Sequence, residues 1–269
     1  MHPNTKNQLL YKDYNKSVTD LLTKSYNGAT KWKLESKLKP QADRFVVNPS
    51  ATSDGVFKTD VEYLVSQCGA NLKATFVPST SELRGVVSYS HLGHKVEGTL
   101  GSDRAYEVSH EGTFQGCIAV HEKFLKNTLE VGVSAAVLPN LHAGVGTLYH
   151  FKDKHCRWTA SCRYAKAGFT GAVSTNALKT YVTSFLVRVP SCPHRVLVAG
   201  EVTCGRGHAW SGTVGVEVDC LLVKGNTLKA RVNRDLVWAV AYVAKVAGNW
   251  TIAVTIDKTL RPGVLLTHS

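Results

Sequence analysis

The stretch Tyr11–Lys37, YKDYNKSVTDLLTKSYNGATKWKLESK, joins an amphipathic helix to an alternating strand. In its first half Val18, Leu21 and Leu22 recur at three- and four-residue spacing, and charged residues fill most positions between them. After Gly28 the period falls to two, because Lys, Lys, Glu and Lys alternate with Trp, Leu and Ser. The stretch therefore predicts a short helix that leads into a strand with one polar face.

The chain has 269 residues, 43% of them apolar, and a mean hydropathy of -0.09. This composition is ordinary for a folded protein, and no run approaches the roughly 18 apolar residues that a membrane helix needs. A transmembrane β-barrel looks the same, since its strands turn only every second residue to lipid. The N-terminus shows no long apolar core with a small-residue cleavage site, so we expect no secretory signal peptide.

Seven cysteines are scattered without a regular framework, which favours free thiols in a reducing compartment. The formal net charge of +12 favours polyanionic partners. Charge alone does not choose among nucleic acid, anionic lipid and phosphorylated metabolites.

After residue 28 the sequence consists of short alternating segments separated by turn residues, and no second helix is predicted. We count about nineteen segments. They are centred near residues 33, 46, 61, 74, 86, 96, 107, 118, 132, 145, 159, 170, 183, 198, 215, 230, 240, 253 and 265. The residues that separate them include Ser102-Asp103, Asp153-Lys154, Lys224-Gly225-Asn226, Gly248-Asn249, Pro78, Pro139, Pro190, Pro193 and Pro262.

Several of these segments have one apolar face, which includes Val131, Val198 and Val216. Such a face suits a barrel with lipid outside and water inside, and it suits equally a soluble sandwich with one solvated face. Small residues predominate on both faces, and the five tryptophans fall near strand ends or on apolar faces, as interfacial anchors do. We therefore interpret the chain as a single all-β domain that forms a membrane barrel.

Eight positions of the N-terminal stretch follow a characteristic order of aromatic, acidic, basic and apolar residues: Tyr11, Asp13, Lys16, Asp20, Leu21, Leu22, Lys24 and Tyr26. In type and spacing they resemble the start of the mitochondrial porins, the voltage-dependent anion channels. Segments 230–233, 236–243, 250–256 and 263–269 are similar to the family's last four strands in order, and 83–90 is similar to its fifth. Residues 100–190 agree only in pattern. The alternative is an ordinary amphipathic helix that opens an unrelated β domain.

The resemblance implies an all-β fold, a transmembrane antiparallel β-barrel of about nineteen strands with an N-terminal amphipathic helix inside the pore. Residues 1–27 would form the N-terminal segment and helix, and residues 28–269 the β-barrel. In the family, the helix narrows the lumen, contributes to voltage gating and contacts adenine nucleotides. Carried over by position, these roles fall on Lys16, Asp20 and Lys24, with Lys12 an additional charge nearby.

The chain departs from the family pattern in three places. The hinge 25–28 is poorer in glycine, which puts ready movement of the helix in doubt. The Gly-Leu-Lys nucleotide motif has no clean counterpart, and 92–95 is the nearest run. The lipid-facing glutamate on the fourth strand of some members falls near Thr75 or Phe76, so regulation through that carboxylate is not expected.

If the apolar faces meet lipid, eight cations line the pore: Lys31, Lys33, Lys95, Arg157, Arg163, Arg195, Lys229 and Arg231. The opposing carboxylates are Glu35, Glu97, Glu130, Glu201, Glu217 and Asp219. An excess of positive charge in a wide aqueous lumen raises the local anion concentration and favours anion flux without tight binding. The alternative is that these residues are simply solvated faces of the sheet.

No catalytic or metal-binding pattern stands out in the sequence. A Walker loop, a GxSxG elbow, an HExxH helix and paired CxxC motifs are absent. The Cys and His groups at 155–162 and 204–208 lack a further ligand at zinc spacing. Gly144 and Gly146 are interpreted as strand glycines. We expect neither an enzyme nor a bound metal or cofactor.

The residues and the resemblance together predict a voltage-gated anion-selective channel of the mitochondrial outer membrane. It would lie in the lipid bilayer and pass small anions and metabolites such as ATP, ADP and phosphate, and homo-oligomer formation is left open. One alternative is the related barrel of the protein-import machinery, although basic presequences would favour an acidic lumen. The other is a soluble basic β protein that binds nucleic acid, which we do not expect as a main partner.

Overall fold

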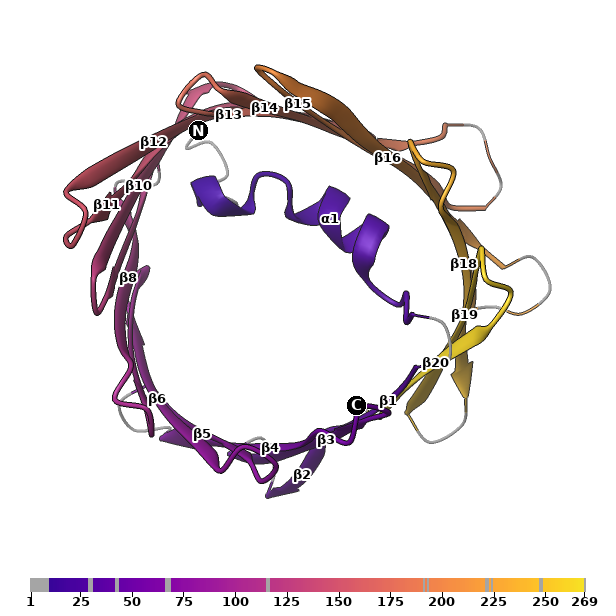
Figure 1. The fold of residues 1–269 in the computed structure, drawn as a ribbon, viewed down its shortest axis with the longest axis horizontal. Coiled ribbons are helices and arrows are strands. Elements are labelled where there is room, and N and C mark those ends of the chain that lie inside the picture. The colour runs from indigo at the N-terminus through magenta and orange to yellow at the C-terminus, as the bar shows by residue number, and fades with distance from the viewer. Residues whose placement is uncertain are drawn as a thin grey trace.

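The strands of the protein form one closed sheet that surrounds a short helix (Figure 1). The computed structural model describes residues 10–28, 31–41, 44–65, 69–114, 117–190, 192, 194–220, 223, 225–246 and 249–268. Its helical elements are the 3₁₀ turn η1 (Tyr11–Asp13) and helix α1 (Lys16–Thr23). Its strands are β1 (Trp32–Ser36), β2 (Leu38–Gln41), β3 (Phe45–Thr52), β4 (Phe57–Val65), β5 (Ala70–Val77), β6 (Glu82–His91), β7 (His94–Gly101), β8 (Tyr106–Phe114), β9 (Ile118–Leu125), β10 (Thr128–Leu138), β11 (Leu141–His150), β12 (His155–Lys166), β13 (Phe169–Asn176), β14 (Thr180–Arg188), β15 (Val196–Gly205), β16 (His208–Asp219), β17 (Thr227–Asn233), β18 (Trp238–Val246), β19 (Trp250–Asp257) and β20 (Pro262–His268).

The segments β1 and β2 are two parts of one strand. Both pair antiparallel with β3, and only Lys37 separates them. The Lys37 N–H still donates to the His268 carbonyl of β20 at 2.9 Å, so the ladder continues across the break. Counted as one strand, they give a barrel of nineteen strands, which confirms the predicted number.

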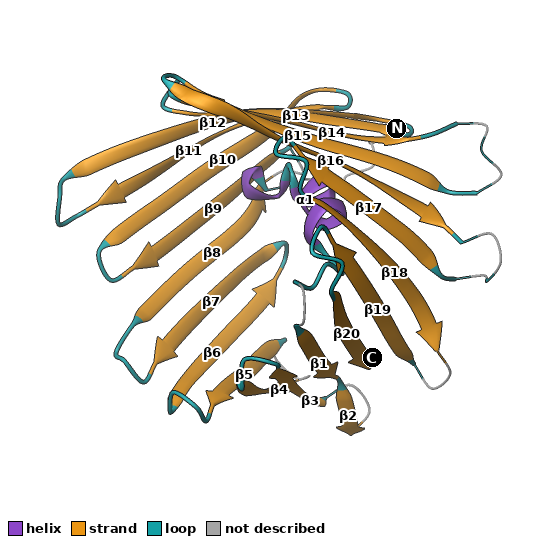
Figure 2. Cartoon of the chain, turned by 45° about the vertical axis from the view of Figure 1, so that its right-hand side comes forward, coloured by secondary structure: helices purple, strands orange, loops and turns teal. Residues whose placement is uncertain are grey.

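The barrel closes through a single parallel pair. Strands β1 and β20 run in the same direction, with Trp32 opposite Val264 and Ser36 opposite His268, whereas the other neighbouring strands that the structure describes are antiparallel. An odd number of alternating strands brings the first and the last together in parallel, so the strand count dictates this pair. Closure joins the first strand to the last, so the paired sheet runs around the whole barrel, as a sheet in hydrocarbon requires, and among the described strands β2 alone pairs on one side only, with β3. Figure 2 shows that the strands are tilted and that α1 lies inside the ring they form.

All nineteen predicted segment centres fall within strands, including those between residues 100 and 190. Three predicted details were wrong. The segment predicted at 236–243 begins only at Trp238, because Leu236 has a φ of 57° and lies in the turn. Pro262 is the first residue of β20, where a missing N–H is tolerated. The helical pattern is interrupted at Tyr14 and Asn15, which separate η1 from α1.

Apart from Pro262, the predicted turns are confirmed where the structure describes them. Lys154, Gly225 and Asn249 all have positive φ between consecutive strands. Cys117, Cys156, Cys162, Cys192 and Cys204 are free thiols, as expected. Four residues of these predictions lie outside the described residues: Cys68, Pro193, Lys224 and Gly248.

The strand register gives the wall two different faces. Large apolar side chains such as Val133, Val214 and Val254 are exposed on the outer face. All five tryptophans lie on this face near strand ends, the position of interfacial anchors. Because a soluble protein does not expose apolar side chains around its whole circumference, the chain is a transmembrane β-barrel and the soluble alternative is wrong.

No helix in the described part of the chain is long and apolar enough to cross a membrane.

Candidate channel lumen

Helix α1 rests on small residues of the inner wall. Its apolar residues Val18, Leu21 and Leu22 are buried against β14, β15 and β16. Ala199 is fully buried among them, and a Cβ added at Gly215 would lie 2.8 Å from Leu22 Cδ2. The apolar stripe predicted from the sequence therefore faces the wall, and the charged side of the helix faces the lumen.

The start of the N-terminal segment is seated on glycines of β10 and β11. Cβ atoms added at Gly132, Gly144 and Gly146 would lie 3.5, 3.1 and 3.1 Å from the Tyr11 ring. The Tyr11 hydroxyl donates to the Thr159 hydroxyl of β12. Gly144 and Gly146 are strand residues, as predicted, and their missing side chains also leave the space that the aromatic ring fills.

The other end of the segment is held by polar contacts. Arg231 donates to the Leu22 carbonyl at 2.6 Å and places its guanidinium 4.3 Å from the centre of the Tyr26 ring. A cation at this position complements the carbonyl end of the helix dipole. The Asn27 side chain donates to the Val264 carbonyl at 2.7 Å. Burial raises the pKa of Tyr26 to about 12, so its ring stays neutral beneath Arg231.

The four helix charges predicted from the resemblance occupy two different settings. Lys12 pairs with Glu111 of β8 and so joins the segment to the wall two strands from β10. Lys24 and Asp20 pair with one another at 2.8 Å, and Lys16 lies 3.9 Å from Asp13. The side chains of Lys16 and Lys24 are both 65% exposed. Exposed pairs of this kind are weak, so both ammonium groups remain accessible to anions in the lumen.

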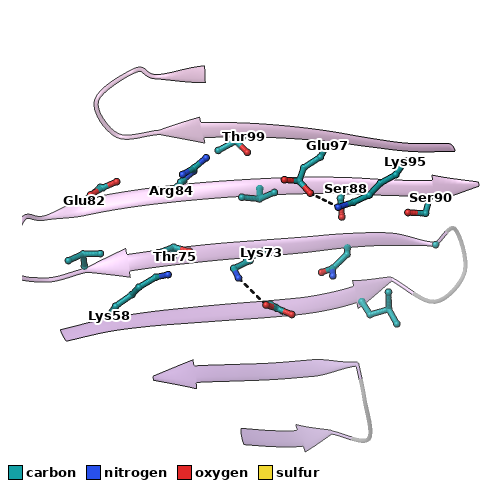
Figure 3. Close-up of a pocket in the computed structure, with 16 residues that line it drawn as sticks. Lys58, Lys73, Thr75, Glu82, Arg84, Ser88, Ser90, Lys95, Glu97 and Thr99 are labelled. Carbon is teal, nitrogen blue, oxygen red and sulfur yellow. Dashed lines mark hydrogen bonds and ion pairs between the residues drawn. The ribbon is translucent and has the colours of Figure 1, made fainter. Parts of the chain in front are cut away.

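The wall opposite the helix is lined by cations and carboxylates that pair along and across the strands. A cavity of about 860 Å³ follows β4, β5, β6 and β7 on this side. Figure 3 shows its side chains, with Lys73 donating to Glu62 at 3.1 Å and Lys95 pairing with Glu97 at 2.9 Å. A wall of this type is wettable and carries little net charge of its own.

Six of the eight predicted pore-lining cations lie on the inner face of strands, and Lys31 and Arg195 immediately precede β1 and β15 at the mouths. The six predicted carboxylates share that face. Most of the cations have a partner: Lys31 with Asp54 (3.3 Å), Lys33 with Glu35 (2.6 Å), Lys95 with Glu97 (2.9 Å), Arg195 with Glu217 (2.6 Å), Lys229 with Glu217 (2.9 Å) and Arg231 with the Leu22 carbonyl (2.6 Å).

The remaining two, Arg157 and Arg163, form no ion pair within the described part of the chain. Arg157 is exposed, and Arg163 Nε has no hydrogen-bond partner there. Pairing therefore offsets much of the positive charge that the residue types alone predicted for the lumen. The least compensated cations are Arg157, Arg163 and the helix lysines.

Sequence reasoning missed a group of charges on the open wall: Lys58, Asp60, Glu62, Lys73, Glu107, Glu111 and Lys123. Their segments were located, but their faces were not assigned. The two-residue spacing of Lys58, Asp60 and Glu62 was the available signal.

The Cys and His groups considered in the sequence do not assemble into a site. Cys156, Cys162 and Cys204 are exposed unpaired thiols. Within the residues that the structure describes, no three or more His, Cys, Asp and Glu side chains are placed to hold a metal ion.

No family model and no curated protein matches this chain. Among solved structures it is similar to two mutants of the porin of Rhodobacter blastica. One has a TM-score of 0.47 and 8% sequence identity, over 81% of this chain and 93% of the porin. The other has a TM-score of 0.47 and 6% identity, over 87% of this chain and 94% of the porin.

Proposed function

We propose that the protein is a voltage-gated, anion-selective channel of the mitochondrial outer membrane, with no catalytic activity. Its solutes would be small anions and metabolites such as phosphate, ADP and ATP. The observation that carries the proposal is the helix docked inside a closed transmembrane barrel, with Lys16 and Lys24 exposed to the lumen.

Anion selectivity in this arrangement comes mainly from the helix. Most cations of the wall are paired with carboxylates, so their fields cancel over short distances. Lys16 lies beside Asp13 of η1 and Lys24 pairs with Asp20 of α1, and within the described residues neither lysine forms an ion pair with the wall. Positive charge at a constriction raises the local concentration of anions without binding them tightly.

Voltage dependence follows if the charged helix moves relative to the wall. Moving one elementary charge through the full potential changes the energy by about 2.3 kcal/mol per 100 mV. The polar contacts of the segment, each worth about 0.5–3 kcal/mol, are of the same order. A modest potential can therefore compete with the contacts of Arg231 and Asn27.

The proposal is tested by Lys16→Glu combined with Lys24→Glu. We expect the reversal potential in asymmetric KCl, measured in planar bilayers, to shift toward cation selectivity, because both changes reverse charge beside the passage. Lys166→Glu is the control, since Lys166 is the last residue of β12 and is exposed on the outer face of the wall. Unchanged reversal potentials in the double variant would remove the helix lysines from the selectivity mechanism.

A further inference from the structure

The turns at one mouth of the barrel carry an arc of exposed cations. Hairpin turns alternate between the two mouths, and the mouth at which β1 begins also holds the turns β9–β10, β11–β12, β13–β14, β15–β16, β17–β18 and β19–β20. Each of these six turns has at least one exposed basic residue. We call the set the basic crescent: Lys126, Lys152, Lys154, Lys179, Arg206, Arg234, Lys258 and Arg261.

Few carboxylates offset this charge. Asp153 and Asp235 are the exposed acids in the same six turns. Asp257 precedes the last turn, where its carboxylate accepts hydrogen bonds from the Thr259 N–H and hydroxyl. In the rest of the same mouth, Asp54 occupies the turn β3–β4, and Asp103 and Arg104 offset one another in the turn β7–β8. The crescent is therefore a positive arc that covers one side of the mouth.

Three turns of the basic crescent also expose a leucine. Leu178, Leu236 and Leu260 are 57%, 77% and 72% exposed, and their φ angles are 56°, 57° and 59°. A bulky side chain in this left-handed region is uncommon and costs roughly 1–2 kcal/mol. Each of these leucines is within two residues of a basic residue of the crescent. Exposed apolar side chains beside cations are typical of segments that enter the surface of an anionic membrane.

Aromatic side chains show that these turns lie at the depth of the lipid headgroups. Trp158, Trp210 and Trp238 are exposed on the outer face within three residues of the strand ends at this mouth. Outward aromatic belts mark the membrane interface. The guanidinium of Arg234 stacks 4.5 Å from the centre of the Trp210 ring, so this cation is directed to the outer, lipid side of the wall.

We propose that the basic crescent binds the headgroups of anionic phospholipids in the adjoining leaflet. The lysine and arginine side chains pair with lipid phosphates and carboxylates, while the three leucines enter the boundary between headgroups and acyl chains. The leucines and the outward Arg234 favour lipid over a dissolved anion, since a dissolved phosphate would gain nothing from an apolar side chain. The inference is independent of what the channel conducts.

The test uses the full chain in phosphatidylcholine vesicles with trace spin-labelled phosphatidylserine or phosphatidylcholine. Electron paramagnetic resonance gives the fraction of each label that the protein immobilises. The crescent variant combines Lys179→Gln, Arg206→Gln, Lys258→Gln and Arg261→Gln. We expect it to lose the preference for phosphatidylserine, because each cation near an anionic surface changes partitioning about fivefold.

The matched control removes four exposed cations at the opposite mouth: Arg44→Gln, Lys166→Gln, Arg188→Gln and Lys245→Gln. It should retain the phosphatidylserine preference. Equal losses in the two variants, or no preference in the native protein, would overturn the proposal. Conductance in neutral phosphatidylcholine bilayers shows that each variant is folded, and it tests the channel function separately.

A leucine variant distinguishes lipid from solute anions. Leu178→Ser, Leu236→Ser and Leu260→Ser keep every cation, so a site for dissolved anions would be unaffected. We expect the immobilised phosphatidylserine fraction to fall in this variant. Full displacement of the labelled lipid by millimolar inorganic phosphate, with no effect of the leucine changes, would assign the crescent to solutes and refute lipid binding.

Discussion

At position 144 a methyl group would crowd three neighbouring atoms of the wall and of Tyr11. A Cβ there would lie 3.1 Å from Tyr11 Cδ2, 3.1 Å from the Val133 carbonyl oxygen and 3.2 Å from Ser134 Cβ. We predict that Gly144→Ala displaces Tyr11 and lowers the free energy of unfolding by about 1–3 kcal/mol, the usual range for overpacking. Urea titration of the folded barrel in detergent measures this change.

Gly132→Ala is the matched control, because its nearest neighbour, Tyr11 Cδ1, would be 3.5 Å away, an ordinary contact. A Tyr11→Ala background should reduce the cost of Gly144→Ala, since one of the close contacts is then absent. If Gly132→Ala is equally destabilising, or the Tyr11→Ala background changes nothing, crowding of the tyrosine is not the cause.

The orientation of single residues could be predicted, but their partners could not. Lys229 and Glu217 were both placed on the inner face, because a period of two assigns every second side chain to one side. The pair of Lys12 and Glu111 joins residues 99 positions apart. That contact depends on where the N-terminal segment docks and on the stagger of the strands, and neither leaves a local pattern in the sequence.

Helix α1 is attached to the inner wall by its apolar stripe and by one cation, Arg231, at its C-terminal end. Arg231→Met removes the hydrogen bond to the Leu22 carbonyl and the contact with the Tyr26 ring. Hydrogen bonds to charged groups contribute about 1.5–3 kcal/mol. Under the proposed voltage gating, we predict that the variant closes at a lower voltage, because less energy is needed to move the helix from the wall. The voltage of half-closure in planar bilayers measures the effect.

Arg195→Met is the control for this prediction. Arg195 is also an inward-facing cation, but its partners are Glu217 and Asp219 on the neighbouring strand rather than the helix. Its removal should leave the half-closure voltage near that of the native channel. A similar shift in both variants would assign the effect to the loss of lumen charge, and the anchoring role of Arg231 would be refuted.

The helix could be predicted from the sequence, whereas the wall residues against which it packs could not. Val18, Leu21 and Leu22 have a clear helical period. Ala199 and Gly215, which receive them, look like the small residues of any strand. Only the packing of the docked segment shows that these two positions must be small.

The strand positions of the whole molecule could be predicted because each strand repeats one local pattern between turn residues, and the family resemblance implied the number nineteen. The break at Lys37 and the positive φ of Leu236 were not predicted, since they depend on how neighbouring strands are staggered. The closing pair follows from the count rather than from any motif. Nineteen alternating strands cannot close without one parallel pair, so a test of that pair is a test of the entire topology.

We predict that Leu34→Cys and Leu266→Cys form a disulfide in the folded barrel. These residues face one another in the parallel pair of β1 and β20, within the spacing that a disulfide spans. In a chain whose native cysteines are replaced by serine, mild oxidation should give a faster-migrating band in denaturing gels. It should also raise the urea midpoint, because the bond joins the two ends of the barrel.

Leu34→Cys with Ile252→Cys is the control, since Ile252 pairs with Leu266 on the far side of β20. Strands two places apart are about 9.5 Å from one another, beyond the reach of a disulfide. Efficient cross-linking of the control pair, or none of the test pair, would mean that β1 does not lie beside β20. The strand count would then have to be even or the barrel open, and the lumen charges assigned from the register would change with it.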